Sequence, residues 1–295
     1  MSTQLNNPGI VGKSHEKTLG SVIFLGVLWL SLAIASIFLL TLFSSLILKG
    51  LGRFDLSLFS AYNNTTPEDA GARAAILGTL FVVGLTALMT IPVGIMAAIY
   101  LEEFADKNRW FNRLIELNIQ NLSAVPAILF GMLTLGVLQL MGFLNKNIVF
   151  GGALALSFLI LPVIILTTRE ALRAVPQEIR SGSLALGATE VQTVLRQTLP
   201  AAVPGIATGT ILAISRAIGE AAPLLLLGAL VFITYDPNGL TAGFTTMPIQ
   251  IFGWSSAAQD EFKSLAAAAS VLLLAILVTM NGLAIFIRNR FAKQW

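Results

Sequence analysis

Residues 206–234 read IATGTILAISRAIGEAAPLLLLGALVFIT, an apolar run interrupted by only two ionisable residues, Arg216 and Glu220. A run of this length can cross the hydrocarbon core of a bilayer as a helix, which takes about 20 residues. Because the two charges stand four positions apart, the spacing places both side chains on one face of a single helix. Counted from Ile206, Arg216 lies about 15 Å along that helix, near the middle of a core about 30 Å thick.

These two charges predict either a path for a charged solute or an internal ion pair that holds helices together. A charge near the bilayer centre costs at least about 2.5 to 3.5 kcal/mol, so it usually faces a polar cavity or a partner. Arginine suits an oxyanion because its planar guanidinium offers several donors and stays charged. We expect Glu220 to pair with Arg216 until an anion competes for the guanidinium. Pro223 predicts a kink near Glu220.

The rest of the chain has the composition of a polytopic membrane protein. Of its 295 residues, 56% are hydrophobic and 11% are charged, and the mean hydropathy is +0.82, far from the composition of soluble domains. Six apolar runs are long enough to span a bilayer as helices. They cover residues 20–48, 75–101, 114–143, 148–168, 206–234 and 262–287. We therefore predict an all-α protein with six transmembrane helices.

The distribution of Lys and Arg over the short loops predicts the orientation of these helices. With the N-terminus in the cytoplasm, the basic residues outside are Lys49, Arg53, Arg73, Lys146 and Lys263. Those inside are Lys13, Lys17, Lys107, Arg109, Arg113, Arg169, Arg173, Arg180, Arg196, Arg288, Arg290 and Lys293. Because the excess of positive charge marks the cytoplasmic side, we expect both termini there. The basic pI then reflects topology, and nucleic acid need not be invoked.

Several kinds of chemistry find little support in the sequence. There is no cysteine, which excludes disulfides, thiolate metal sites and a cysteine nucleophile. Gly12-Lys13-Ser14 matches only the end of a P-loop, since Asn7 stands where that motif needs its first glycine. His15, the single histidine, has no second metal ligand beside it. We therefore expect no enzymatic activity, no metal and no cofactor in this chain, and assign any ATP hydrolysis to another chain.

The loop 169–205 is predicted to contain short amphipathic helices joined at Gly187. It has no proline between Pro176 and Pro200, and its leucines and valines recur at roughly helical spacing. Its apolar face is expected either to fit a groove on a partner or to lie on the lipid surface.

The sequence also supports structural predictions for two other loops. The loop 235–261 is rich in Gly, Pro and Thr, and we expect a short helix around residues 248–254. Glu102, Glu103 and Asp106 are followed at once by basic residues, which predicts a solvated loop of mixed charge, with contact to a partner as the alternative.

Residues 181–200 resemble the EAA loop of ABC importer permeases, whose pattern is E-A-A-x3-G-x9-I-x-L-P. Gly187, Leu199 and Pro200 match in register, whereas Ser181-Gly182-Ser183 replaces the opening triplet and Gln197 takes the isoleucine position. The resemblance implies a coupling helix that docks into an ATPase. Its contact residues would be Leu184, Gly187, Ala188, Leu199 and Pro200.

Longer stretches resemble the permeases of phosphate importers. They are NLSAVPAILFG at 121–131, LPV at 161–163 with TTREALRAVP at 167–176, and SRAIGEAAPL at 215–224. MPIQIF at 247–252, with Trp254 and Glu261-Phe262, is similar to the PstA family in particular. The resemblance covers about residues 74–287. It implies a type I, MetI-like permease core there, after a tail at 1–19 and a first helix and outer loop at 20–73, and before a tail at 288–295.

The resemblance implies a function and a set of partners. The chain would form half of the pathway of an ATP-driven phosphate importer in the bacterial inner membrane, with Arg216 and Glu220 on the phosphate path. Its partners would be a PstC-type permease, two copies of a PstB-type ATPase that holds ATP and Mg, and a periplasmic PstS-type phosphate-binding protein. Two alternatives stay open: a permease for sulfate or molybdate, and an anion transporter or channel that needs no ATPase.

Overall fold

A computed structural model of the protein describes residues 19–106, 109–229 and 232–291. Within these ranges the regular secondary structure is helical, with one isolated antiparallel bridge between Ile148 and Gly243. The all-α prediction is therefore confirmed. The P-loop-like Gly12-Lys13-Ser14 and His15 lie outside the described residues.

The chain divides into two compact units, residues 1–48 and 49–295. Most of α1 (Leu19–Gly50) belongs to the first unit, and it carries no charge before Lys49. Its 32 residues give a helix about 48 Å long, which exceeds the thickness of a hydrocarbon core. The first predicted span is confirmed.

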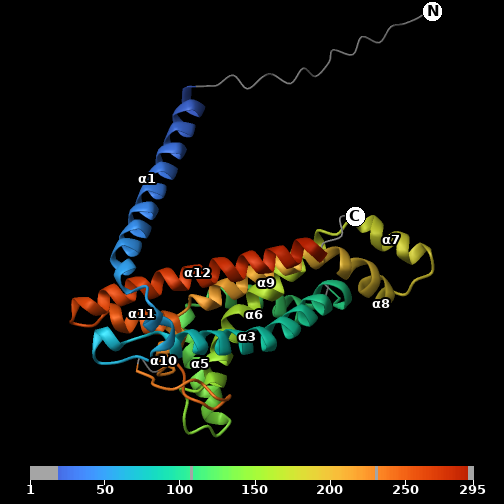
Figure 1. Cartoon of the computed structure of the whole chain (residues 1–295). Helices are drawn as coiled ribbons and strands as arrows, with labels where there is room; N and C mark the ends of the chain where they lie inside the picture. The colour runs from blue at the N-terminus through green and yellow to red at the C-terminus, as the bar shows by residue number, and fades with distance from the viewer. Residues whose placement is uncertain (1–18, 107–108, 230–231, 292–295) are drawn as a thin grey trace, which may run out of the picture. The chain divides into compact units, whose positions relative to one another are not determined.

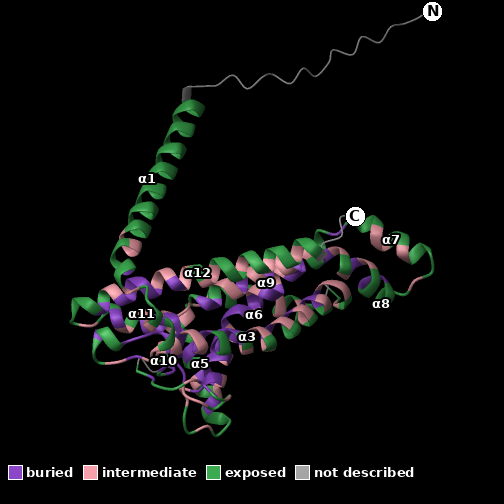
Figure 2. Ribbon diagram, in the orientation of Figure 1, coloured by how far each residue is buried: buried purple, intermediate pink, exposed green. Residues whose placement is uncertain are grey.

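Four further long helices build the second unit: α3 (Arg73–Ile99), α6 (Val149–Arg173), α9 (Leu199–Ile218) and α12 (Asp260–Phe291). Helix α6 packs between α3 and α9, and α12 packs along α9 (Figure 1). Among the described residues, five helices in all are long and apolar enough to cross a membrane. Helix α6 is the central element of the unit and is mostly buried (Figure 2).

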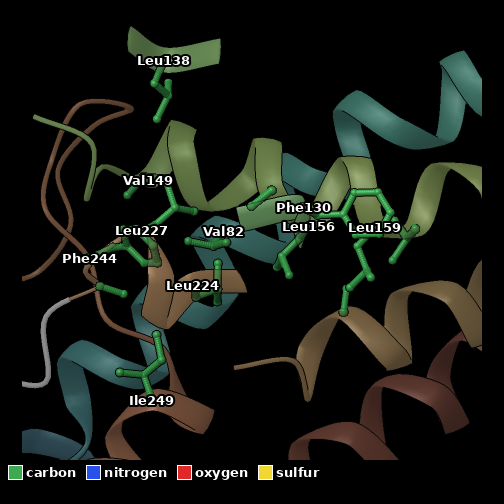
Figure 3. Close-up of a cluster of buried hydrophobic side chains, with 14 of the residues drawn as sticks. Val82, Phe130, Leu138, Val149, Leu156, Leu159, Leu224, Leu227, Phe244 and Ile249 are labelled. Atoms are coloured by element: carbon green, nitrogen blue, oxygen red, sulfur yellow. The ribbon is translucent and has the colours of Figure 1, made fainter. Parts of the chain in front are cut away.

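Small residues let these helices approach closely, as in other membrane-protein interfaces. A Cβ added at Gly94 of α3 would collide with Ile164 of α6, and one added at Gly209 of α9 would collide with Thr167 of α6. The main core cluster joins Val82 of α3 to side chains from α5, α6, α10 and α11 (Figure 3).

The third predicted span is wrong as a single straight helix. Residues 114–143 contain two helices, α4 (Trp110–Ser123) and α5 (Ala127–Leu140), bent by 114° at a short break. Pro126 lies in that break, and proline removes a backbone donor and disfavours the helical conformation of the residue before it. The polar first half predicted from the sequence is the separate helix α4. Only if the bent pair counts as one span does the number among the described residues reach six.

Short helices lie at the two ends of the second unit. One end carries η3 (Tyr100–Phe104), a π-helical continuation of α3. The same end carries a hairpin formed by α7 (Gln177–Ala185) and α8 (Glu190–Thr193). After α8 the chain passes through the π-helical turn η4 (Val194–Thr198) into α9. The other end carries α10 (Ala222–Leu226) and α11 (Met247–Ser255) (Figure 1). The remaining short elements are η1 (Leu51–Arg53), α2 (Leu56–Ser60) and η2 (Pro67–Asp69).

Loop contacts at the α11 end are specific. The Trp254 indole donates to Asn63 at 2.9 Å, and the backbone amide of Met247 donates to the Thr79 hydroxyl at 2.8 Å. Arg73 pairs with Asp236 at 2.7 Å. The hydrogen bond and the charge of Arg73 hold the pKa of the Asp236 carboxyl below its usual value. The helix expected around residues 248–254 is confirmed as α11.

Candidate functional site

Arg216 lies in the last turn of α9, and Glu220 lies beyond the end of that helix. The chain leaves the helix at Gly219, and α10 begins at Ala222 with Pro223 in its first turn. Pro223 cannot donate a backbone hydrogen bond to the oxygen of Gly219, so a helix that continued through this segment would lose that bond. The prediction that both charges share one face of a single helix is therefore wrong, and a break replaces the predicted kink.

The helix also begins earlier than the predicted span, which changes the position of Arg216 along the helix. Counted from Leu199, the first residue of α9, Arg216 lies about 25 Å along the helix at about 1.5 Å per residue. It stands at the C-terminal end of its helix, where a positive charge is favourable because the helix dipole is negative there. The predicted depth near the middle of the bilayer stays a prediction, while the place of Arg216 along its helix is the C-terminal end.

The expected resting ion pair between Arg216 and Glu220 does not form. Within the described part of the chain, no side-chain hydrogen bond or ion pair reaches either group. Arg216 is exposed on the surface of the single chain, and Glu220 is half-buried. A cation on a membrane-embedded helix has to face water, a solute or another subunit. The guanidinium is therefore available to a ligand from outside the chain.

The turn that carries Glu220 is held by the helices around it. A Cβ added at Gly131 of α5 would collide with the backbone of Pro223, which shows how closely α10 lies on α5. Leu224 and Leu227 follow directly and are buried in the main core cluster (Figure 3). The break between α9 and α10 is thus a fixed feature of the fold, because both sides of it are packed.

A polar seam between α9 and α12 was missed by the sequence reasoning. The Ser215 hydroxyl donates to Asn281 Oδ1 at 2.6 Å, and Arg288 Nη1 donates to the Thr208 hydroxyl at 2.7 Å. The two contacts lie seven residues apart on each helix, as an antiparallel pair requires. Asn281 was a detectable signal, because a polar residue inside an apolar run needs a partner. The seam fixes the turn of α9 that ends in Arg216.

The hairpin of α7 and α8 carries most of the predicted ATPase contacts on its surface. Leu184, Gly187 and Leu186 are exposed, the last at 91%, and Ala188 is half-buried. Ser183 and Thr193 share a hydrogen bond of 2.9 Å that ties the two arms together. The prediction of short amphipathic helices joined at Gly187 is confirmed (Figure 2).

The two remaining predicted contacts lie at the base of the hairpin. Leu199 is half-buried and packs against a cluster that includes Leu172 and Val175 of the α6 end. Pro200 is exposed in the first turn of α9, where its missing N–H is tolerated. The structure therefore separates an exposed tip, at residues 184–188, from a base that packs on the membrane helices.

Gly187 has a φ of +86°, a conformation that β-branched residues adopt only under strain. We expect Gly187→Val to destabilise the hairpin by about 1 to 2 kcal/mol, seen as roughly tenfold faster exchange of the α7 and α8 amides with deuterium. Gly182→Ala is the matched control: it lies inside α7 with open space around it, so it should stabilise the helix by about 0.5 to 1 kcal/mol. Equal exchange in the two variants would contradict the strain argument.

Glu102 and Glu103 do not lie in a solvated loop, and that prediction is wrong. Both side chains are buried, with 5% and 9% exposure. Arg169 of α6, itself 5% exposed, contacts Glu102 at 3.1 Å and Glu116 of α4 at 2.9 Å. The partners of these carboxylates lie on other helices, and the result is a charge cluster at the end of the unit that carries the hairpin, in which Glu102 and Arg169 are buried and Glu116 is partly exposed.

Comparison with known proteins places this geometry in a family. A model of the family described as "Binding-protein-dependent transport system inner membrane component" matches residues 90–293. The chain is 30% identical to the phosphate transport system permease protein PstA of Haemophilus influenzae, over 91% of this chain and 92% of that protein. It is 32% identical to the probable ABC transporter permease protein YqgI of Bacillus subtilis, over 78% of this chain and 73% of that protein.

Two solved structures share the fold. A chain of the MetNI methionine ABC transporter in an inward-facing conformation matches with a TM-score of 0.61 and 16% identity, over 74% of this chain and 95% of that one. A chain of a bacterial alginate ABC transporter, solved with an alginate-bound periplasmic protein, matches with a TM-score of 0.63 and 17% identity, over 95% of this chain and 99% of that one.

Proposed function

Because the chain belongs to the family of inner-membrane components of binding-protein-dependent transport systems, we propose that it forms half of the pathway of an ATP-driven importer of inorganic phosphate. It is a multi-pass ABC importer permease subunit with a MetI-like fold. The substrate, the energy source and the named partners are the proposed part. The observation that carries the substrate proposal is the exposed, unpaired guanidinium of Arg216, in a chain whose relatives of similar length include PstA proteins.

The chemistry of the two charges supports phosphate over other oxyanions. A guanidinium binds phosphate, sulfate and molybdate alike, because each presents paired oxygens to its planar fork. Phosphate differs because it still carries a proton at neutral pH, its second pKa being about 7 when unsubstituted and about 6 as an ester. A carboxylate such as Glu220 can accept a hydrogen bond from that proton, whereas it repels a fully ionised sulfate. We assign Arg216 to anion binding and Glu220 to selection of the protonated anion.

The proposed partners follow from the exposed surfaces. The tip of the hairpin, with Leu184, Gly187 and Ala188, docks into a PstB-type ATPase, two copies of which bind ATP and Mg. The face that carries Arg216 meets a PstC-type permease that completes the path, and the end with α11 receives a PstS-type phosphate-binding protein. Both chain termini and the hairpin then lie in the cytoplasm, in keeping with the excess of Lys and Arg there.

Reconstitution tests this proposal. The chain, purified with the second permease and the ATPase, is placed in liposomes with the binding protein, and uptake of radiolabelled phosphate is measured with and without ATP. We expect uptake only with ATP and with all subunits present, and much slower uptake of sulfate or molybdate. Uptake by the lone chain without ATP would show the alternative, an independent anion transporter. Faster uptake of sulfate would show a different oxyanion permease.

A further inference from the structure

Arg180 belongs to the hairpin, but its side chain points back into the membrane helices. It lies in α7, where Gln177, Glu178 and Ser181 are exposed, and yet its own side chain is only 15% exposed. Its Nη2 donates to Glu103 Oε1 at 2.8 Å and to the backbone oxygen of Leu172 at 2.7 Å, and its Nη1 donates to the oxygen of Val175 at 2.8 Å. A second, longer contact joins Nε to the same carboxylate at 3.4 Å. Arg180 thus binds the ends of two other helices at once.

The partner carboxylate is placed by an unusual turn. Glu103 lies in η3, the π-helical turn that ends α3. Single π-helical turns shift the side-chain register of a helix and often occur at functional positions. Here adjacent residues reach different partners: Glu102 contacts Arg169 and Arg173 of α6, while Glu103 contacts Arg180 of α7. Glu102, Glu103, Arg173 and Arg180 line a pocket of about 360 Å³.

This ion pair is the direct polar connection from the hairpin to α3. Within the described ranges, the ion pairs of α7 go to η3 alone. The apolar contact of α7 is made by Ile179, which packs on a cluster of residues from the α6 end and α9 that also includes Ile95 and Ile99 of α3. A bidentate guanidinium–carboxylate pair is strongly directional, and partial burial strengthens it. A movement of the hairpin therefore pulls on the end of α3 through Glu103.

We propose that Glu103 and Arg180 form the joint through which movement of the hairpin is passed to α3, which makes them positioning residues for the coupling of ATP hydrolysis to transport. The inference rests on the proposed function, because it needs an ATPase docked on the hairpin. Neither residue touches the transported anion. The Arg169 cluster fixes α3, α4 and α6 to one another, whereas the Glu103–Arg180 pair connects that fixed body to the part that an ATPase would move.

The test compares Glu103→Gln, Arg180→Gln and the double variant in the reconstituted complex, with Glu178→Gln as the control. Glu178 lies on the same helix α7 and is exposed without an ion pair among the described residues. The measured quantity is the amount of ATP hydrolysed per phosphate imported. We expect each single variant to raise this ratio by roughly 2- to 30-fold, with the ATPase still bound, and the double variant to match the singles because both remove one interaction.

The possible outcomes distinguish a failure of the proposed role of the Glu103–Arg180 pair from a failure of the proposed function. Suppose that the wild-type complex imports phosphate with ATP and that the single variants hydrolyse the same amount of ATP per phosphate as the wild type. The proposed role of the Glu103–Arg180 pair is then wrong, and the proposed function stands. Effects that multiply in the double variant would also overturn it, because they would show two independent roles. Loss of the bound ATPase in the single variants would assign the pair to docking instead. A wild-type complex that shows no ATP-driven uptake overturns the proposed function and the joint together.

Discussion

Replacing Arg216 with alanine is expected to lower the rate of phosphate import by roughly 10- to 100-fold, which corresponds to the loss of hydrogen bonds to a charged group. The side chain is exposed and makes no hydrogen bond or ion pair within the described residues, so its removal leaves α9 and its packing intact. Surface substitutions of this kind change stability by less than about 0.5 kcal/mol. The loss should therefore be one of transport and not of assembly.

Two further variants serve as controls for Arg216→Ala. Arg216→Lys keeps the charge but loses the planar fork, so we expect intermediate import. Arg113→Ala removes an exposed basic residue of α4 and should import at the wild-type rate. The measurement is the initial rate of uptake of radiolabelled phosphate, alongside the yield of assembled complex. Import by Arg216→Ala at the wild-type rate would show that this arginine lies off the path.

The second large effect concerns stability. Arg169→Ala should destabilise the fold by about 3 to 5 kcal/mol, because it removes the inner partner of the buried Glu102 carboxylate. Glu102 loses a contact of 3.1 Å and Glu116 one of 2.9 Å, and the Glu102 side chain is 5% exposed. Arg173 still contacts Glu102 at 2.9 Å, which limits the loss without replacing the inner contact.

The measurement for Arg169→Ala is the denaturant midpoint of unfolding in detergent. Arg113→Ala again serves as the control, since it removes a charge that lies on the surface. Replacement of Arg169, Glu102 and Glu116 together by apolar side chains of similar size should restore much of the stability, because no buried charge then remains without a partner. An unchanged midpoint for Arg169→Ala would mean that water reaches the cluster and that the pairs are not buried.

Local patterns in the sequence predicted the features that depend on local chemistry. The hairpin turn at Gly187 could be predicted because a positive φ there needs glycine, and α11 because proline at the start of a short apolar stretch favours a helix. The long spans followed from composition alone. In each of these cases the residues that decide the structure lie within a few positions of the element that they form.

The errors have two physical causes. In some cases the contact partner of a residue lies far away along the chain, and in another the sequence signal of a helix break is the same as that of a kink. Glu102 is followed by basic residues, which suggested a solvated loop, but its buried partner Arg169 is 67 residues away. Pro223 signalled a disturbance near Glu220, and only the packing of α10 on α5 turns that disturbance into a full break. Asn281 likewise indicated a polar contact, but its partner Ser215 could not be predicted, because α9 and α12 meet only in the fold.

The central claim is that Arg216 binds the transported phosphate, and a structure of the assembled complex with bound phosphate tests it most directly. We predict that the anion lies on the face of this chain that meets the second permease, with a phosphate oxygen about 2.7 to 3.2 Å from the Arg216 guanidinium. A structure in which phosphate occupies the path while Arg216 is closed in an ion pair with another subunit would contradict the claim.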